Sequence, residues 1–148
     1  MNLIIIFCAK YLIFVISIIT ALFLLIRYGF TKIFLKNILI VFISSGFAWV
    51  FAHFLKDIIK NPRPDETLAL IQDNSFSFPS GHTTFLSALG VSIARLDRKT
   101  GYWILLLALV VGFSRVLAGV HFWYDIVGGF ILGILIVYLI NKIVKTRY

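Results

Sequence analysis

Long runs of apolar residues constrain this chain more than any other feature. They cover residues 3–26, 38–56, 80–95, 102–118 and 122–140. A helix needs about 20 apolar residues to cross a bilayer, because the hydrocarbon core is about 30 Å thick and each residue adds about 1.5 Å. Hydrophobic residues make up 61% of the chain, against roughly 45–50% in a soluble domain. The pattern predicts an all-α integral membrane bundle of about five transmembrane helices, formed by one domain over residues 1–148.

Two of these runs have features of their own. Residues 3–26 are too long for the core of a signal peptide and lack a small-residue cleavage pattern, so we expect a spanning helix. Residues 80–95 are rich in Ser, Thr, Gly and Ala, which suits a helix buried among other helices. About 15 residues rise only about 22 Å, so this helix should begin below the membrane surface.

The last run contains a G-x-x-x-G pair, Gly129 and Gly133. Small residues at this spacing let two helices approach closely. We expect the pair to pack within the bundle, and the alternative is a dimer formed through the same two glycines.

The basic residues predict how the helices are oriented. Three Lys or Arg lie in each of three segments, namely 27–37, 95–101 and the tail from residue 142. Basic loops tend to stay in the cytoplasm, and with five spans these segments share one side. The 57–79 loop and the 119–121 turn are then expected on the extracytoplasmic side of the plasma membrane. Because this bias explains the net charge of +8, nucleic acid is not an expected partner.

Three polar clusters interrupt the apolar sequence on that expected outer side. They cover residues 56–64, 79–82 and 114–125. Ionisable residues within membrane segments are costly and usually mark a functional site. We therefore expect residues far apart in the sequence to meet in one pocket at the outer edge of the bilayer.

The residue types in these clusters suit a phosphate group. Lys56, Arg63 and Arg115 supply three cations for a dianion. Residues 80–82 lie where a helix is expected to begin, and free backbone N–H groups and the helix dipole attract an anion there. Gly81 would let the anion approach the backbone closely.

Two histidines provide a nucleophile and a proton donor. Asp125 follows His121 by four residues, so their side chains share a face if helical turns continue through them. The carboxylate would fix the tautomer of the imidazole and leave the other ring nitrogen free to attack. We therefore expect His121 to be the nucleophile. His82 has no acidic residue nearby in the sequence and is expected to be the general acid.

A metal site is the alternative role for His121 and Asp125. Catalytic zinc usually has three protein ligands, and the sequence shows no third convergent His, Cys or Glu, since Cys8 is the single cysteine. We expect neither a metal nor another cofactor.

Together the three clusters resemble the signature of the type 2 phosphatidic acid phosphatase superfamily. The family pattern is K-x6-RP, then PSGH, then SR-x5-H-x3-D. Here it reads Lys56 to Arg63-Pro64, Pro79 to His82, and Ser114-Arg115 to His121 and Asp125. Every position matches, and the resemblance covers roughly residues 56–125.

This resemblance implies a metal-independent phosphatase with a defined role for each matching residue. His121 would form a phosphohistidine, Asp125 would orient it, and His82 would protonate the leaving oxygen. The phosphoryl oxygens would be held by Lys56, Arg63, Ser80, Gly81 and Arg115. Bacterial membrane members of the family have six spans, one more than the sequence predicts here.

The implied substrate is a lipid phosphate within the bilayer. One candidate is undecaprenyl diphosphate, the carrier of cell-wall synthesis, and the other is phosphatidylglycerophosphate, phosphatidate or lipid A. The short 65–78 loop leaves little protein for gripping a large headgroup, which favours the prenyl diphosphate. A non-catalytic lipid-phosphate binder or transporter is the alternative from a different class, and intact candidates for every catalytic role argue against it.

Overall fold

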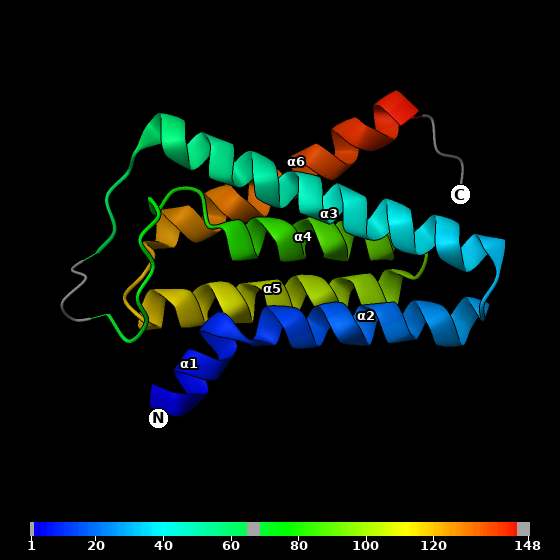
Figure 1. The fold of residues 1–148 in the computed structure, drawn as a ribbon, viewed down its shortest axis with the longest axis horizontal. Helices are drawn as coiled ribbons and strands as arrows, with labels where there is room; N and C mark the ends of the chain where they lie inside the picture. Colours follow the sequence, from blue (N-terminus) through cyan, green and yellow to red (C-terminus); the bar gives the residue numbers. More distant parts are fainter. Residues whose placement is uncertain (1, 65–68, 145–148) are drawn as a thin grey trace.

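The structure, a computed structural model, describes residues 2–64 and 69–144. The described residues form helices, turns and loops, and contain no strand. In chain order the helices are α1 (Asn2–Lys10), α2 (Leu12–Tyr28), α3 (Lys32–Ile59), α4 (Gly81–Ala94), α5 (Arg98–Leu117) and α6 (Trp123–Val144). The expected all-α bundle is confirmed (Figure 1).

The membrane spans differ in detail from the sequence prediction. Helices α3, α5 and α6 are long and apolar enough to cross a bilayer. The first apolar run is broken at Tyr11, where α1 and α2 meet at an angle of 52°, and this bent pair passes as a fourth span. The remaining predicted span is α4, which has only 14 residues and is too short to cross by itself.

Local sequence signals explain where several helices begin and end. The side chain of Thr31 accepts a hydrogen bond from the Phe34 amide at the start of α3, and Asp97 does the same for Thr100 at the start of α5. Such N-caps satisfy amides that lack a partner within the helix. Helix α3 ends at Ile59, and its C-cap residue Lys60 has a left-handed conformation (φ 52°). Pro62 follows two residues later and cannot continue a helix.

Helix α4 lies at the centre of the bundle and packs against α3, α5 and α6. Ten of its 14 residues are buried, several of them Ser or Thr. The hydroxyls of Thr84 and Ser87 donate to the carbonyls of Ser80 and Thr84. Because these polar groups are satisfied within the helix, they can be buried without a large desolvation cost. The expectation of a buried helix rich in small residues is confirmed.

Gly129 and Gly133 bring α6 against α4. A Cβ at Gly129 would lie 2.6 Å from the Ser80 carbonyl oxygen, and one at Gly133 would overlap the Ser87 hydroxyl and the α4 backbone. The pair therefore packs within the bundle, as expected. Because α4 covers this face of α6, the two glycines are not available for the alternative contact with a second copy.

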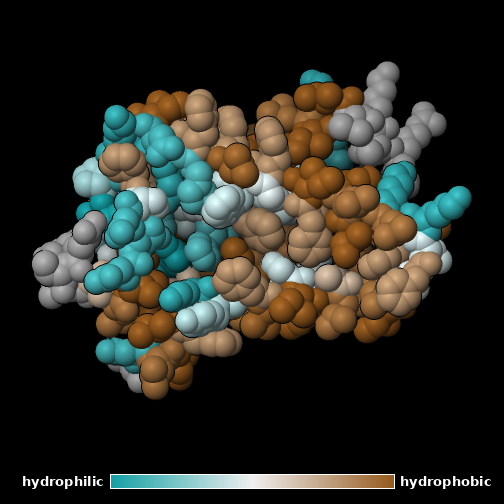
Figure 2. Space-filling view, viewed as in Figure 1, coloured by the Kyte–Doolittle hydropathy of each residue, from teal (hydrophilic) through white to brown (hydrophobic). Residues whose placement is uncertain are grey.

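The polar loops gather at the two ends of the bundle. The described parts of the 60–80 loop and the α5–α6 turn share one end, whereas the α2–α3 and α4–α5 turns share the other (Figure 1). At the second end Arg27 and Asp97 lie 4.0 Å apart. Figure 2 shows hydrophilic residues concentrated at the end with the 60–80 loop and hydrophobic residues over much of the remaining face. This grouping of the loops agrees with the one predicted from the basic residues.

A matched pair of glycine substitutions tests the central role of α4. Gly133→Ala should lower the free energy of unfolding by about 1–3 kcal/mol, the usual cost of overpacking, because the new methyl group meets α4. Gly46→Ala is the control, since a Cβ there meets nothing within 4 Å and alanine favours the helix. Thermal unfolding in detergent, followed by tryptophan fluorescence, compares them. Equal unfolding temperatures for the two variants would contradict this packing.

Candidate active site

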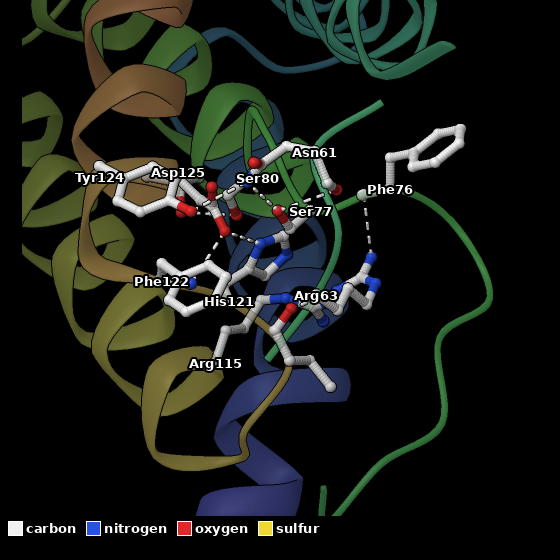
Figure 3. Close-up of polar contacts among 12 residues, drawn as sticks. Asn61, Arg63, Phe76, Ser77, Ser80, Arg115, His121, Phe122, Tyr124 and Asp125 are labelled. Atoms are coloured by element: carbon white, nitrogen blue, oxygen red, sulfur yellow. Dashed lines mark hydrogen bonds and ion pairs between the residues drawn. The ribbon is translucent and has the colours of Figure 1, made fainter. Parts of the chain in front are cut away.

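The three polar clusters converge at one end of the bundle. The backbone amide of Ser80, just before α4, donates to the Asp125 carbonyl at 3.0 Å. Arg63, in the loop after α3, donates through Nη1 to the carbonyl of Val120 in the α5–α6 turn. These bonds join segments that are 45 and 57 residues apart in the sequence. The predicted pocket is therefore assembled by loops and helix ends (Figure 3).

His121 and Asp125 form a buried pair. His121 Nδ1 lies 3.1 Å from Asp125 Oδ2, and the two side chains are 1% and 0% exposed. The same carboxylate oxygen accepts the Phe122 amide at 2.8 Å. Because a carboxylate accepts hydrogen bonds, Nδ1 carries the proton and Nε2 keeps its lone pair. Figure 3 shows these side chains facing each other.

The helix does not run through this pair, because the turn predicted at residues 119–121 separates α5 from α6. Helix α5 ends at Leu117, and α6 begins at Trp123. Gly119 adopts φ 76° in the turn between them, a value that glycine tolerates readily. His121 therefore lies before the first turn of α6, and Asp125 reaches back from that turn. The spacing of four residues still brings the side chains together, although for a different reason.

The electrostatic surroundings of His121 favour its neutral form. Burial lowers the pKa of His121, and the nearby charges of Arg115 and Arg63 lower it further, to about 2. A neutral imidazole with a free Nε2 lone pair is the form that can act as a nucleophile.

Arg63 is held by several acceptors. Its Nε donates to the Ser75 carbonyl at 2.5 Å, and its Nη2 donates to the Ser75 hydroxyl at 2.8 Å and lies 3.3 Å from the Phe76 carbonyl. With the bond to Val120, these contacts orient the guanidinium, whose side chain is 2% exposed.

Arg115 and Lys56 are also buried at this end of the bundle. Arg115, in the last turn of α5, donates from Nη1 to the Ala9 carbonyl at 3.1 Å. Its buried Nε has no hydrogen-bond partner among the described residues, so it is a donor that an anion could use. Lys56, in the last turn of α3, contacts Ser75 Oγ at 3.2 Å and the Phe76 carbonyl at 2.5 Å.

Ser80 and Gly81 lie at the start of α4, as predicted. Ser80 is fully buried, and its hydroxyl lies 3.1 Å from that of Thr83. The Ser80 side chain makes no capping bond to the helix amides. A Cβ on Gly81 would lie 2.8 Å from His53 Cε1, so glycine is needed for close packing.

The sequence analysis missed Asp73. Its two carboxylate oxygens contact Arg63 Nη2 at 2.9 Å and Arg115 Nη2 at 2.8 Å. Partial burial by itself raises the pKa of Asp73. The positive charges of Arg63 and Arg115 and the hydrogen bonds donated by Ser75 outweigh this effect and lower the pKa to about 2. The one feature of the sequence that could have indicated Asp73 is its negative charge in a loop of a strongly basic chain. The other acidic residues of this loop, Asp65 and Glu66, lie outside the described residues.

Two hollows meet at His82. A polar cavity of about 180 Å³ is lined by His82, Arg115, Asp73, Lys10 and two further loop residues, Ile71 and Gln72. An apolar groove of about 310 Å³ is lined by His82 together with Ile13, Phe14, Ser17, Gly46, Trp49 and Phe85. His82 therefore has Arg115 on one side and an apolar groove between α2, α3 and α4 on the other.

Comparison with known proteins gives a consistent result. The model of the PAP2 superfamily matches residues 10–148. The chain is 39% identical over 98 residues to phosphatidylglycerophosphatase B of Bacillus subtilis, covering 59% of this chain and 48% of that protein. It is 43% identical over 65 residues to undecaprenyl-diphosphatase BcrC of Bacillus subtilis, covering 43% and 33%. The chain thus spans half or less of the length of these two relatives.

The fold is also similar to a solved structure. The crystal structure of a transmembrane PAP2 type phosphatidylglycerolphosphate phosphatase from Bacillus subtilis superimposes with a TM-score of 0.68 at 26% identity. The match covers 99% of this chain and 79% of the other.

The low pKa of His121 can be tested by its titration. Because the pKa is about 2, the folded imidazole should stay neutral from pH 8 to pH 5, whereas an unfolded histidine binds a proton near pH 6.5. Unfolding therefore takes up a proton below about pH 6.5, and this group makes the protein less stable as the pH falls. NMR of labelled histidines, with His121→Gln to assign the signal, measures the titration. A His121 midpoint near pH 6.5 in the folded protein would contradict the described burial.

Proposed function

The chain belongs to the PAP2 superfamily, and on that premise we propose that it is a membrane lipid phosphatase. The observation that carries the proposal is the position of His82. It lines both the polar cavity with Arg115 and the apolar groove among the membrane helices. A lipid phosphate has the matching shape, since its headgroup needs cations and its tail needs an apolar surface.

In the first step His121 attacks the substrate phosphorus. The Nε2 lone pair forms the N–P bond, and the bond from phosphorus to the lipid or diphosphate oxygen breaks. Asp125 holds the attacking imidazole through Nδ1 at 3.1 Å and stabilises the positive charge that develops on it. Lys56, Arg63 and Arg115 balance the charge on the phosphoryl oxygens, with Ser80 and Gly81 at the start of α4 as further contacts.

His82 is the proposed proton donor in this step. It protonates the leaving oxygen, and the bound dianion favours the protonated form of its imidazole. In the second step neutral His82 accepts a proton from water as the water attacks the phosphohistidine. The N–P bond then breaks, inorganic phosphate forms and His121 is regenerated. The three basic groups and the two histidines thus complete a cycle without a metal.

We propose undecaprenyl diphosphate as the substrate, with undecaprenyl phosphate as the lipid product. The described part of the loop between α3 and α4 folds onto the site, so little protein is left to recognise a large headgroup. Phosphatidylglycerophosphate is the second candidate, because the chain is similar to phosphatases named for each lipid. The proposed site faces the extracytoplasmic side of the plasma membrane, since the basic loops lie at the opposite end of the bundle.

A panel of purified lipid phosphates tests the activity and the substrate together. Wild-type protein should release phosphate from undecaprenyl diphosphate faster than from phosphatidylglycerophosphate, phosphatidate or lipid A. His121→Ala should reduce release by about 10³-fold or more, the scale of loss when a covalent nucleophile is removed. Phosphate release in mixed micelles, with and without a chelator, is the measurement.

His53→Ala is the matched control for this experiment. It removes the third histidine of the chain, whose ring bonds the Trp49 carbonyl one turn earlier in α3. The control should keep most of the activity. If His121→Ala were as active as the control, His121 would not be the nucleophile. If neither wild type nor the control released phosphate from any lipid of the panel, the chain would be a binder or transporter rather than a phosphatase. Loss of activity on chelation would instead support a metal site.

A further inference from the structure

One carboxylate bridges the two arginines of the site. Asp73 Oδ1 lies 2.9 Å from Arg63 Nη2, and Asp73 Oδ2 lies 2.8 Å from Arg115 Nη2. The arginines come from different segments, the loop after α3 and the last turn of α5. Each guanidinium thus donates to a separate oxygen of one anionic group, the arrangement in which arginines also hold a phosphoryl group.

The bridging side chain is less buried than the arginines it joins. Asp73 is 29% exposed, whereas Arg63 and Arg115 are 2% and 5% exposed. Asp73 lines the polar cavity beside His82 and also a cavity of about 310 Å³ beside Arg63 and Gly119. It therefore lies between the buried cations and the space from which an anion would approach them.

The loop around Asp73 supplies acceptors to the third cation as well. Lys56 contacts the Ser75 hydroxyl and the Phe76 carbonyl. Asp73 Oδ1 in turn accepts from the amide of Ser75 at 3.2 Å and from its hydroxyl at 2.9 Å. Segment 73–76 thus stabilises all three basic residues of the family signature with its own oxygens.

From these contacts we propose that Asp73 is a positioning residue that exchanges with the phosphoryl group in each catalytic cycle. In the empty site its carboxylate holds the two guanidiniums in the geometry that a phosphoryl group needs. Substrate then displaces the carboxylate, which rotates towards the exposed side of the loop. After hydrolysis the carboxylate returns and speeds the release of inorganic phosphate.

The charges in the site favour an Asp73 carboxylate that leaves the arginines when a phosphoryl group binds over one that stays between them. A carboxylate left between the arginines would keep their two facing Nη2 donors from the phosphoryl oxygens and would place a negative charge beside a dianion. A dianion carries more charge than the carboxylate and has three oxygens, so it can replace the bridge. Arg115 Nε, which lacks an acceptor among the described residues, is an additional donor for the incoming group.

Asp73→Asn tests this exchange, because the amide keeps the shape and removes the charge. The dissociation constant for inorganic phosphate should fall about tenfold, the effect of removing a competitor worth roughly 1.4 kcal/mol. KM for the lipid should fall with it, while kcat should stay constant or decrease as phosphate release slows. Binding is measured from the rise in unfolding temperature with phosphate concentration. Unchanged or weaker phosphate binding would overturn the proposal.

Hydrogen exchange separates displacement from simple charge repulsion. In wild type the Ser75 amide donates to Asp73 Oδ1, so phosphate should increase exchange in the peptide covering residues 69–77. In Asp73→Asn no charged carboxylate is displaced, so exchange in this peptide should change little with phosphate. Slower exchange in wild type on phosphate binding would mean that the carboxylate stays in place, which contradicts the exchange.

Two variants control for charge and for folding. Asp57→Asn removes the same charge from an exposed site in the last turns of α3 and should leave phosphate affinity unchanged. Asp73→Glu keeps a carboxylate and should bind phosphate more like wild type than like Asp73→Asn. If the amide variant fails to fold, the hydrogen-exchange measurement on wild type still tests the proposal. If Asp57→Asn tightened phosphate binding equally, the effect would be one of overall charge and the proposal would be wrong.

The inference rests on the proposed function for the identity of the anion, but the two can fail separately. Phosphate binding and hydrogen exchange require no turnover. Wild type that exchanges Asp73 for phosphate but hydrolyses no lipid would contradict the phosphatase proposal alone. An active enzyme whose affinity for phosphate is the same in wild type and in Asp73→Asn would contradict this inference alone.

Discussion

The burial of three cations at one end of an apolar bundle is the constraint on which the site depends. A buried charge costs several kcal/mol unless partners compensate for it. Here the loop between α3 and α4 compensates, through the Asp73 carboxylate, the Ser75 hydroxyl and backbone carbonyls. The loop is therefore part of the candidate active site. Its oxygens keep the basic groups ordered before any anion binds, which is the preorganisation that electrostatic catalysis requires.

Helix α4 connects this polar end to the membrane interior. Its small residues let α3, α5 and α6 approach, and the hydroxyls of Thr84 and Ser87 donate to carbonyls one turn earlier. Because α4 is too short to span, its first turn lies inside the bundle rather than at a loop surface. His82 is thereby held between the polar cavity and the apolar groove. The shortness of one helix thus places the proposed acid where a lipid headgroup would meet its tail.

Several features could be predicted from the sequence because each follows from local pattern. The apolar runs predicted the helices, and the small residues of 80–95 predicted its burial. Other features could not. The bend at Tyr11 interrupts an apolar run that has no Pro or Gly to mark a break. Asp73 was missed because its role depends on contacts with two distant arginines. Arg63 lies ten residues before it and Arg115 lies 42 residues after it.

The sequence by itself determined the membrane environment, the family signature and the types of group available for phosphoryl transfer. These are properties of composition and of residue order. Tertiary structure alone decided how the arginines are partnered. Asp73 reaches both arginines through a folded loop, and Arg63 donates to the carbonyl of Val120, 57 residues later in the chain. The spacing of these residues in the sequence does not indicate that they are close in space, so only the packing of the bundle brings them together.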